Sequence, residues 1–157
     1  MSNIKPFLEA GVFSPASSTS ATSNILHTTR AMPSIAARTP LRFILVDSPE
    51  NFKPDYWGRV VAVFTTGQVW QFKSYRWTNP TELFNHALGI YVGWEGEGLP
   101  DTVKGWGRAV KTVRLEKWTG AQKEGVRWRD REAVEGIWTA IEESMRARGW
   151  ASGAPAR

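Results

Sequence analysis

Residues 55–77 read DYWGRVVAVFTTGQVWQFKSYRW, and this stretch decides the fold class. Its apolar block VVAVF, residues 60–64, has no alternation of polar and apolar side chains. That pattern predicts a strand covered on both faces, in the middle of a sheet. After the interruption TTG, the composition of VWQF at 69–72 predicts a second strand. Trp70 and Phe72 would then share one face of that strand, with Gln71 and Lys73 on the other.

The flanking sequence alternates between helix and strand signals. Helices are predicted at residues 3–10, 80–88 and 130–148, with a cap at Asn79 and a core-facing stripe that includes Trp138. Gly89 is expected to end the second helix. Further strands are predicted at 25–30, 42–47, 90–92 and 109–117, with a glycine-rich loop at 93–107. The strand at 42–47 contains a continuous apolar run, FILV at 43–46, and is expected to be central. The pattern favours a three-layer α/β sandwich.

Length and composition limit the class of protein. The 157 residues suit one domain, and 41% hydrophobic with 22% charged residues is typical of a globular chain. No apolar run approaches the ~20 residues of a membrane span, and no secretory signal pattern is found. The chain has no cysteine, which excludes disulfides and thiolate metal sites. We expect a single domain over residues 1–150, with a flexible polar loop at 14–24 and a disordered tail at 151–157.

The positive charge is concentrated in one segment. Residues 101–131 carry nine Lys or Arg against four Asp or Glu, which equals the net charge of +5 for the whole chain. Such a concentration favours an acidic partner: nucleic acid, a phosphopeptide or an acidic tail. A solvated basic face without a partner is an equally weighted alternative on charge alone.

Four sequence blocks resemble one known family. They are WGRVVAVFTTGQVWQF, LFNHALGIYVGWEG, LPDTVKGWG and EGIWTAIEESMRARGW, and a weaker likeness extends back to NIKPFLE at 3–9. Together they resemble the C-terminal domain of parafibromin and its fungal counterparts, a subunit of the RNA polymerase II-associated factor complex. The resemblance implies a Ras-like GTPase fold without nucleotide binding. The family pattern has an apolar strand before the NIKPFLE helix that this sequence lacks, so we expect the fold to be one strand short.

The resemblance also implies a role. The domain would serve transcription elongation in the nucleus, as a non-enzymatic module linked to chromatin and histone modification. Its implied partners are other subunits of the complex and the phosphorylated C-terminal repeats of RNA polymerase II and of elongation factors. A basic, tryptophan-rich nucleic-acid binder is the alternative, and a scaffold derived from a GTPase without any surface ligand is the third possibility.

The sequence contains none of the catalytic motifs that a Ras-like fold or a hydrolase would need. No GxxxxGK[ST] phosphate loop is present, and DSPE at 47–50 replaces the DxxG that a GTPase would place there. His27 and His86 are distant in sequence and lack cysteine partners, so zinc binding is not expected. The loop acids Glu95 and Glu97 are more simply a solvated pair than an acid–base pair. We therefore predict no enzyme, no cofactor and no metal.

The predicted partner-binding residues combine aromatic rings with cations, because arginine and lysine pair with phosphates and tryptophan offers a platform beside them. Arg114 is expected to face outward from its strand together with Glu116. Alternation puts Lys111 on the side of Val113, and we expect it near the strand end, where its long stem can reach water. The full set is Trp70, Gln71, Lys73, Arg76, Trp77, Lys104, Arg108, Lys111 and Arg114.

Overall fold

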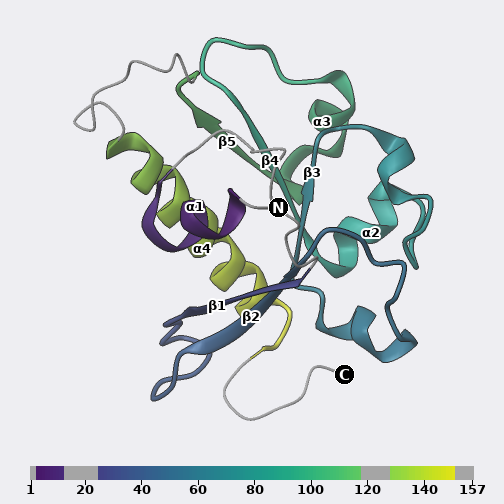
Figure 1. Cartoon of the computed structure of the whole chain (residues 1–157). Helices are drawn as coiled ribbons and strands as arrows, with labels where there is room; N and C mark the ends of the chain where they lie inside the picture. Colours follow the sequence, from purple (N-terminus) through teal and green to yellow (C-terminus); the bar gives the residue numbers. More distant parts are fainter. Residues whose placement is uncertain (1–2, 13–24, 118–127, 151–157) are drawn as a thin grey trace.

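The computed structural model describes residues 3–12, 25–117 and 128–150, and its strands form two separate sheets (Figure 1). In the first sheet β1 (Ile25–Arg30) pairs antiparallel with β2 (Leu41–Val46). The second sheet is parallel, with β4 (Leu88–Trp94) between β3 (Ala62–Thr65) and β5 (Val110–Leu115). Parallel strands joined by helical connections are typical of α/β proteins, so the predicted class is confirmed.

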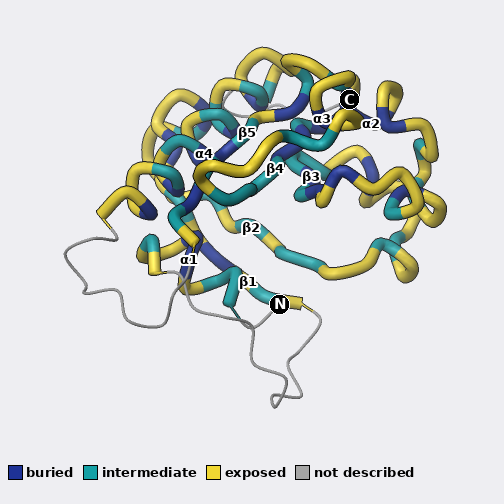
Figure 2. Tube along the Cα trace, turned by 90° about the horizontal axis from the view of Figure 1, so that it is seen from above, coloured by how far each residue is buried: buried dark blue, intermediate teal, exposed yellow. Residues whose placement is uncertain are grey.

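Helices cover both faces of the parallel sheet. On one side lie α1 (Ile4–Ala10) and α4 (Trp128–Ala147), and on the other α2 (Pro80–His86) and α3 (Asp101–Trp106). Three short 3₁₀ helices complete the described elements: η1 (Pro54–Arg59), η2 (Val69–Phe72) and η3 (Gly107–Ala109). Buried residues occur both in the strands of the parallel sheet and on the helices that pack against it (Figure 2).

The larger core lies between the sheet and the α1–α4 layer. Ile137 and Ile90 are fully buried there, and the predicted stripe of α4 faces inward as expected. Trp138 is 3% exposed and donates its indole N–H to the Leu8 carbonyl, 2.9 Å away. This carbonyl belongs to the last turn of α1, where helix carbonyls lack partners within the helix. The bond therefore joins α1 to α4.

The second core lies beneath α2 and α3. Phe72 and Leu83 are fully buried, and the ring of Trp106 packs 6.0 Å from that of Phe72. The cap predicted for α2 is present, because Asn79 accepts a hydrogen bond from the Thr81 amide at 3.0 Å. This layer carries the loops that follow β3 and β4.

Two strands that were predicted to be central in a sheet are not central in the structure. The strand at 60–64 is β3, which is covered on both faces as predicted but forms an edge of its sheet. The run at 42–47 is β2, half of a two-stranded hairpin and not a central strand. Its Ile44 is 62% exposed, because only one face of the hairpin packs against α4. An unbroken apolar run predicts that both faces of a strand are buried. In the hairpin one face of β2 is exposed, so that prediction was wrong here.

Three local predictions were wrong. Residues 69–72 form η2 and not a strand, so Trp70 and Phe72 do not share a face. The predicted loop at 93–107 contains α3. Helix α2 ends at His86, and Gly89 lies inside β4, where an added Cβ would stand 2.7 Å from the Val110 side chain. Glycine there permits close strand and side-chain packing and does not end the helix.

The break between the two sheets falls between β2 and β3, which pair with nothing on their facing sides among the described residues. The expectation of a missing strand stays a prediction. The predicted loop at 14–24 and tail at 151–157 lie outside the described residues.

Candidate partner-binding surface

The exposed ring of Trp70 is held on a rigid turn. Gly67 has φ +84°, a conformation that L side chains rarely adopt, and its carbonyl accepts from the Thr102 hydroxyl at 2.6 Å. After this turn, Gln71 donates its side-chain amide to the Phe64 carbonyl at 2.7 Å, and Phe72 is fully buried. Trp70, between these anchors, is 65% exposed. The local packing therefore fixes the turn while leaving the indole to solvent.

Trp70 has an apolar neighbour and a cation on the same turn. Val69 is 51% exposed, and Lys73 is exposed and forms no ion pair among the described residues. We call Val69, Trp70 and Lys73 the η2 surface. Val69 was not among the predicted site residues. Gln71 was among them, but its amide is used to hold η2 against β3.

Arg76 and Trp77 belong to a neighbouring aromatic cluster. Trp77 stacks on His86, with ring centroids 3.9 Å apart and planes inclined by 11°. The guanidinium carbon of Arg76 lies 5.4 Å from the centroid of the Trp77 ring, a cation–π distance. Trp57, 8% exposed, packs edge-on against Trp77 and anchors the cluster to η1. His86 itself is exposed.

Two residues of the basic segment lie in the same layer as η2. Lys104 is on α3, whose Thr102 contacts the Gly67 turn. Its ammonium pairs with Asp101 at 3.3 Å, and both side chains are largely exposed, so this ion pair is weak and exchangeable. Arg108, in η3, is exposed and has no ion pair among the described residues.

The other two predicted site residues of the basic segment, Arg114 and Lys111, lie away from the η2 surface. Arg114 is half-buried and donates to the carbonyls of Trp94, at 3.0 Å, and Glu97. Its guanidinium thus closes the loop after β4, which corrects the expectation of an outward-facing side chain. Lys111 is exposed, but Val110 before it faces the α2–α3 core. Strand alternation directs Lys111 to the opposite side of the sheet from the η2 surface.

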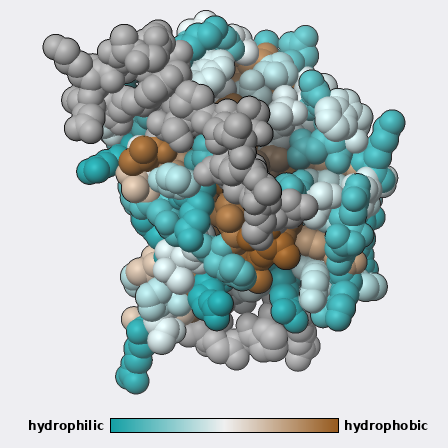
Figure 3. Space-filling model, viewed as in Figure 1, coloured by the Kyte–Doolittle hydropathy of each residue, from teal (hydrophilic) through white to brown (hydrophobic). Residues whose placement is uncertain are grey.

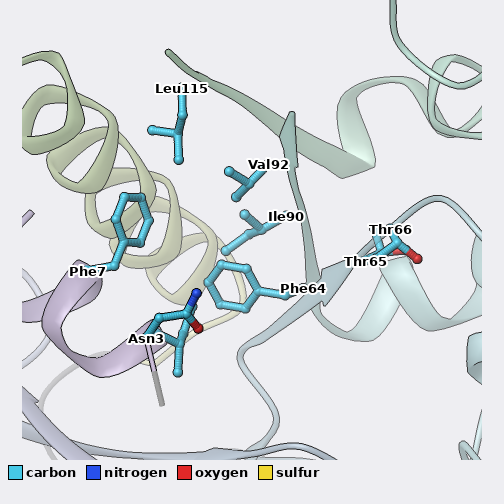
Figure 4. A pocket seen from close by; sticks show the side chains of 9 residues that line it. Asn3, Phe7, Phe64, Thr65, Thr66, Ile90, Val92 and Leu115 are labelled. Carbon is cyan, nitrogen blue, oxygen red and sulfur yellow. The ribbon is translucent and has the colours of Figure 1, made fainter. Parts of the chain in front are cut away.

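An apolar hollow of about 260 Å³ lies between the start of α1 and the parallel sheet (Figure 4). Its walls include Phe7 from α1, Phe64 from β3 and Ile90 from β4. Apolar surface is visible near the middle of this face of the molecule in Figure 3, beside the atoms drawn in grey. None of the lining residues is titratable, so the hollow offers no acid–base chemistry. It adjoins the unpaired side of β3.

The described residues contain no cluster of three or more His, Asp or Glu side chains suited to a metal ion. Of the loop acids, Glu97 pairs with Lys117 at 3.3 Å, which supports the solvated-pair interpretation. Neither His27 nor His86 stands in such a cluster. No helix in the described ranges is long and apolar enough to span a bilayer.

The fold and surface together define an α/β domain that presents an exposed aromatic turn with flanking cations. The family model described as "RNA pol II accessory factor, Cdc73 family, C-terminal" matches residues 1–144. The chain therefore belongs to the Cdc73 family, of which parafibromin was the resemblance seen in the sequence.

Relatives from three organisms agree. Cell division control protein 73 of Saccharomyces cerevisiae is 36% identical over 152 residues, covering 96% of this chain and 36% of the relative. The Schizosaccharomyces pombe protein of the same name is 36% identical over 154 residues, covering 94% and 39%. The Arabidopsis thaliana Protein CDC73 homolog is 31% identical over 153 residues, covering 93% and 35%. The chain spans somewhat over a third of the length of these curated relatives.

A solved structure, "The conserved domain of yeast Cdc73", is similar in fold. Its TM-score is 0.80 at 36% sequence identity, covering 94% of this chain and 88% of that one. Both the sequence blocks and the arrangement of layers thus lead to the same family.

Proposed function

We propose that this chain is a non-enzymatic interaction domain of an RNA polymerase II accessory factor. It works in the nucleus within the polymerase-associated factor complex and binds phosphorylated C-terminal repeats of the polymerase or of elongation factors. The family membership supports the accessory role. The chain spans somewhat over a third of the length of its curated relatives.

The observation that carries the proposal is the exposed Trp70. Its ring stays 65% in water while its neighbours are anchored, and tryptophan is enriched among the residues that dominate binding energy. The turn is already ordered, so this domain would lose little conformational entropy when a partner binds.

The phosphate contacts are assigned to cations that the fold leaves available. Lys73 on the η2 surface and Arg108 in η3 have no ion-pair partner among the described residues, and Lys104 has only the weak pair with Asp101. Charge-assisted hydrogen bonds to phosphate contribute about 1.5–3 kcal/mol each. We exclude Arg114, because its guanidinium is used by the carbonyls of Trp94 and Glu97.

The test is a titration of the chain with phosphorylated and unphosphorylated repeat peptides. Trp70→Ala should weaken binding of the phosphorylated peptide by roughly 30-fold, from ~2 kcal/mol for a hot-spot residue. Its melting temperature should stay unchanged, because the ring is exposed. Trp128→Ala is the matched control, since Trp128 is 57% exposed but lies at the start of α4 in the other layer. Equal loss in both variants, or no preference for the phosphorylated peptide, would reject the proposal.

Nucleic-acid binding remains the second candidate, supported by exposed cations beside an exposed indole. The two functions differ in their salt dependence and in their response to phosphate. A DNA or RNA oligonucleotide should lose affinity steeply with salt regardless of its sequence. If Lys73→Glu with Arg108→Glu reduces oligonucleotide binding but not phosphopeptide binding, the second candidate replaces the first.

A further inference from the structure

The connection between β1 and β2 has an anchored half and an exposed half. In the first half Met32 and Ile35 are buried, and Ser34 donates its amide and hydroxyl to Glu142 of α4, at 3.1 and 2.6 Å. Beyond it, residues 37–40 are all exposed. The antiparallel ladder starts only at the pair Arg30 with Leu41, so these four residues are outside it.

The exposed half has the sequence Ala-Arg-Thr-Pro and continues into Leu41 and Arg42. Thr39 therefore precedes a proline and stands three residues before an exposed arginine. A residue before proline is biased to extended backbone, and proline has no N–H that could compete for hydrogen bonds. Thr39 is exposed, and its hydroxyl takes part in no hydrogen bond among the described residues.

We propose that Thr39 is a phosphorylation site for a proline-directed serine/threonine kinase that reads a cation three residues after the acceptor. The Thr39 hydroxyl oxygen attacks the γ-phosphorus of magnesium-bound ATP. The bond from that phosphorus to the β,γ-bridging oxygen breaks, ADP leaves, and the hydroxyl proton passes to the kinase's catalytic aspartate. Proline after the acceptor selects the extended backbone, and Arg42 supplies the charge pattern by which such a kinase discriminates substrates.

The product fits the surroundings of Thr39. A phosphothreonine carries about −1.5 to −2 charge at neutral pH. Arg38 and Arg42 flank it in sequence, both are exposed, and neither forms an ion pair among the described residues. Arginine holds phosphate through paired N–H donors, so the modified loop gains charge-assisted contacts. The chain would change from a net charge of +5 to about +3.

A second site in the chain offers a built-in comparison. Ser48 also precedes a proline, but Asp47 and Glu50 flank it, and its hydroxyl accepts a hydrogen bond from the Glu50 amide at 3.3 Å. Negative neighbours oppose both a cation-reading kinase and the phosphate that it would add. Ser14 is the remaining serine or threonine that is followed directly by proline, and it lies outside the described residues.

The proposal is independent of the η2 surface. The β1–β2 hairpin is packed on the α4 side and lies across the molecule from α2 and α3 (Figure 1). Phosphorylation at Thr39 should therefore leave the affinity for a repeat peptide unchanged, and failure of one proposal leaves the other intact.

In the test, the folded chain is incubated with magnesium ATP and a cyclin-dependent kinase. The kinase chosen requires proline directly after the acceptor and a basic residue three positions after it. Tandem mass spectrometry assigns the phosphate. We expect it on Thr39, lost in Thr39→Val, reduced roughly tenfold in Arg42→Gln and unchanged in Ser48→Ala. A peptide of residues 34–44 should be modified as well.

Each contrary outcome overturns the proposal. If the peptide is modified but the folded chain is not, the hairpin does not present Thr39. If neither is modified, the sequence is not a substrate. Equal labelling of Ser48, or an unchanged rate in Arg42→Gln, would show that the flanking charges do not select the site. Melting temperatures of the variants, expected to match the parent chain, exclude misfolding as a cause.

Discussion

Trp138 offers the sharpest test of how the α1–α4 layer is held together. Its ring is 3% exposed, lies 5.1 Å from the ring of Phe43 and donates to the Leu8 carbonyl. Truncating such a residue to alanine costs about 3–5 kcal/mol. Trp138→Phe keeps much of the ring but removes the N–H, which leaves a carbonyl without its partner at a cost of about 1–3 kcal/mol.

These costs are large beside the ~5–15 kcal/mol that stabilises a typical domain. At about 2–4 °C per kcal/mol for a chain of this size, Trp138→Ala should melt roughly 6–20 °C lower. Trp138→Phe should fall between the alanine variant and the parent. Circular dichroism melts would measure both, with Trp128→Ala as the exposed control.

Hydrogen exchange separates the packing contribution from the hydrogen bond. In Trp138→Phe the amides at the C-terminal end of α1 should exchange faster, because that end loses its contact with α4. An unchanged melting temperature in Trp138→Ala would refute the assignment of the stripe to the core. A phenylalanine variant as stable as the parent would refute the role of the bond to Leu8.

Three further outcomes are expected. Gly67→Ala should lower the melting temperature, because φ is +84° and the new Cβ would stand 3.0 Å from Val103; Gly58→Ala, with open space around it, is the control. Asn79→Ala should cost ~1 kcal/mol in urea unfolding by removing the cap of α2. The hydrogen bond from Arg30 holds the pKa of Glu135 below its ordinary value of 4.5. Its stabilisation is therefore complete above about pH 4.5 and lost as pH falls through the lower folded-state pKa, so the difference in urea midpoint from Glu135→Gln should shrink on acidification; it should be small, since the pair is exposed.

The order of helices and strands could be predicted from sequence where periodicity and caps agree. The stripe of α4 and the Asn79 cap of α2 are local features, and both are present in the structure. The strand at 60–64 was also found, as β3, but its place at a sheet edge was not. Pairing partners come from distant segments, so an apolar run reports that both faces are covered and not which strands lie beside it.

The sequence indicated which residue types could form the candidate site, but it did not predict how the backbone arranges them. Residues 69–72 have a strand-like composition, yet they form η2, because the Gly67 turn redirects the chain and Gln71 bonds to the Phe64 carbonyl. Sequence alternation therefore put Trp70 on the same face as Phe72, whereas one is exposed and the other buried. The glycine at 67 was the available signal for a sharper turn.

The sequence by itself determined the family, the α/β class and the residue types at the surface, because motifs, periodicity and charge are properties of the chain. The tertiary structure decided which of those residues are available. Arg114 lies in the basic segment and Glu97 in the glycine-rich loop, and only folding brings the Arg114 guanidinium to the Glu97 backbone carbonyl. Lys73 and Trp70 stay exposed because the groups around them are already satisfied or buried. Hydrogen-bond partners and burial depend on contacts between segments far apart in the chain, and no local pattern contains them.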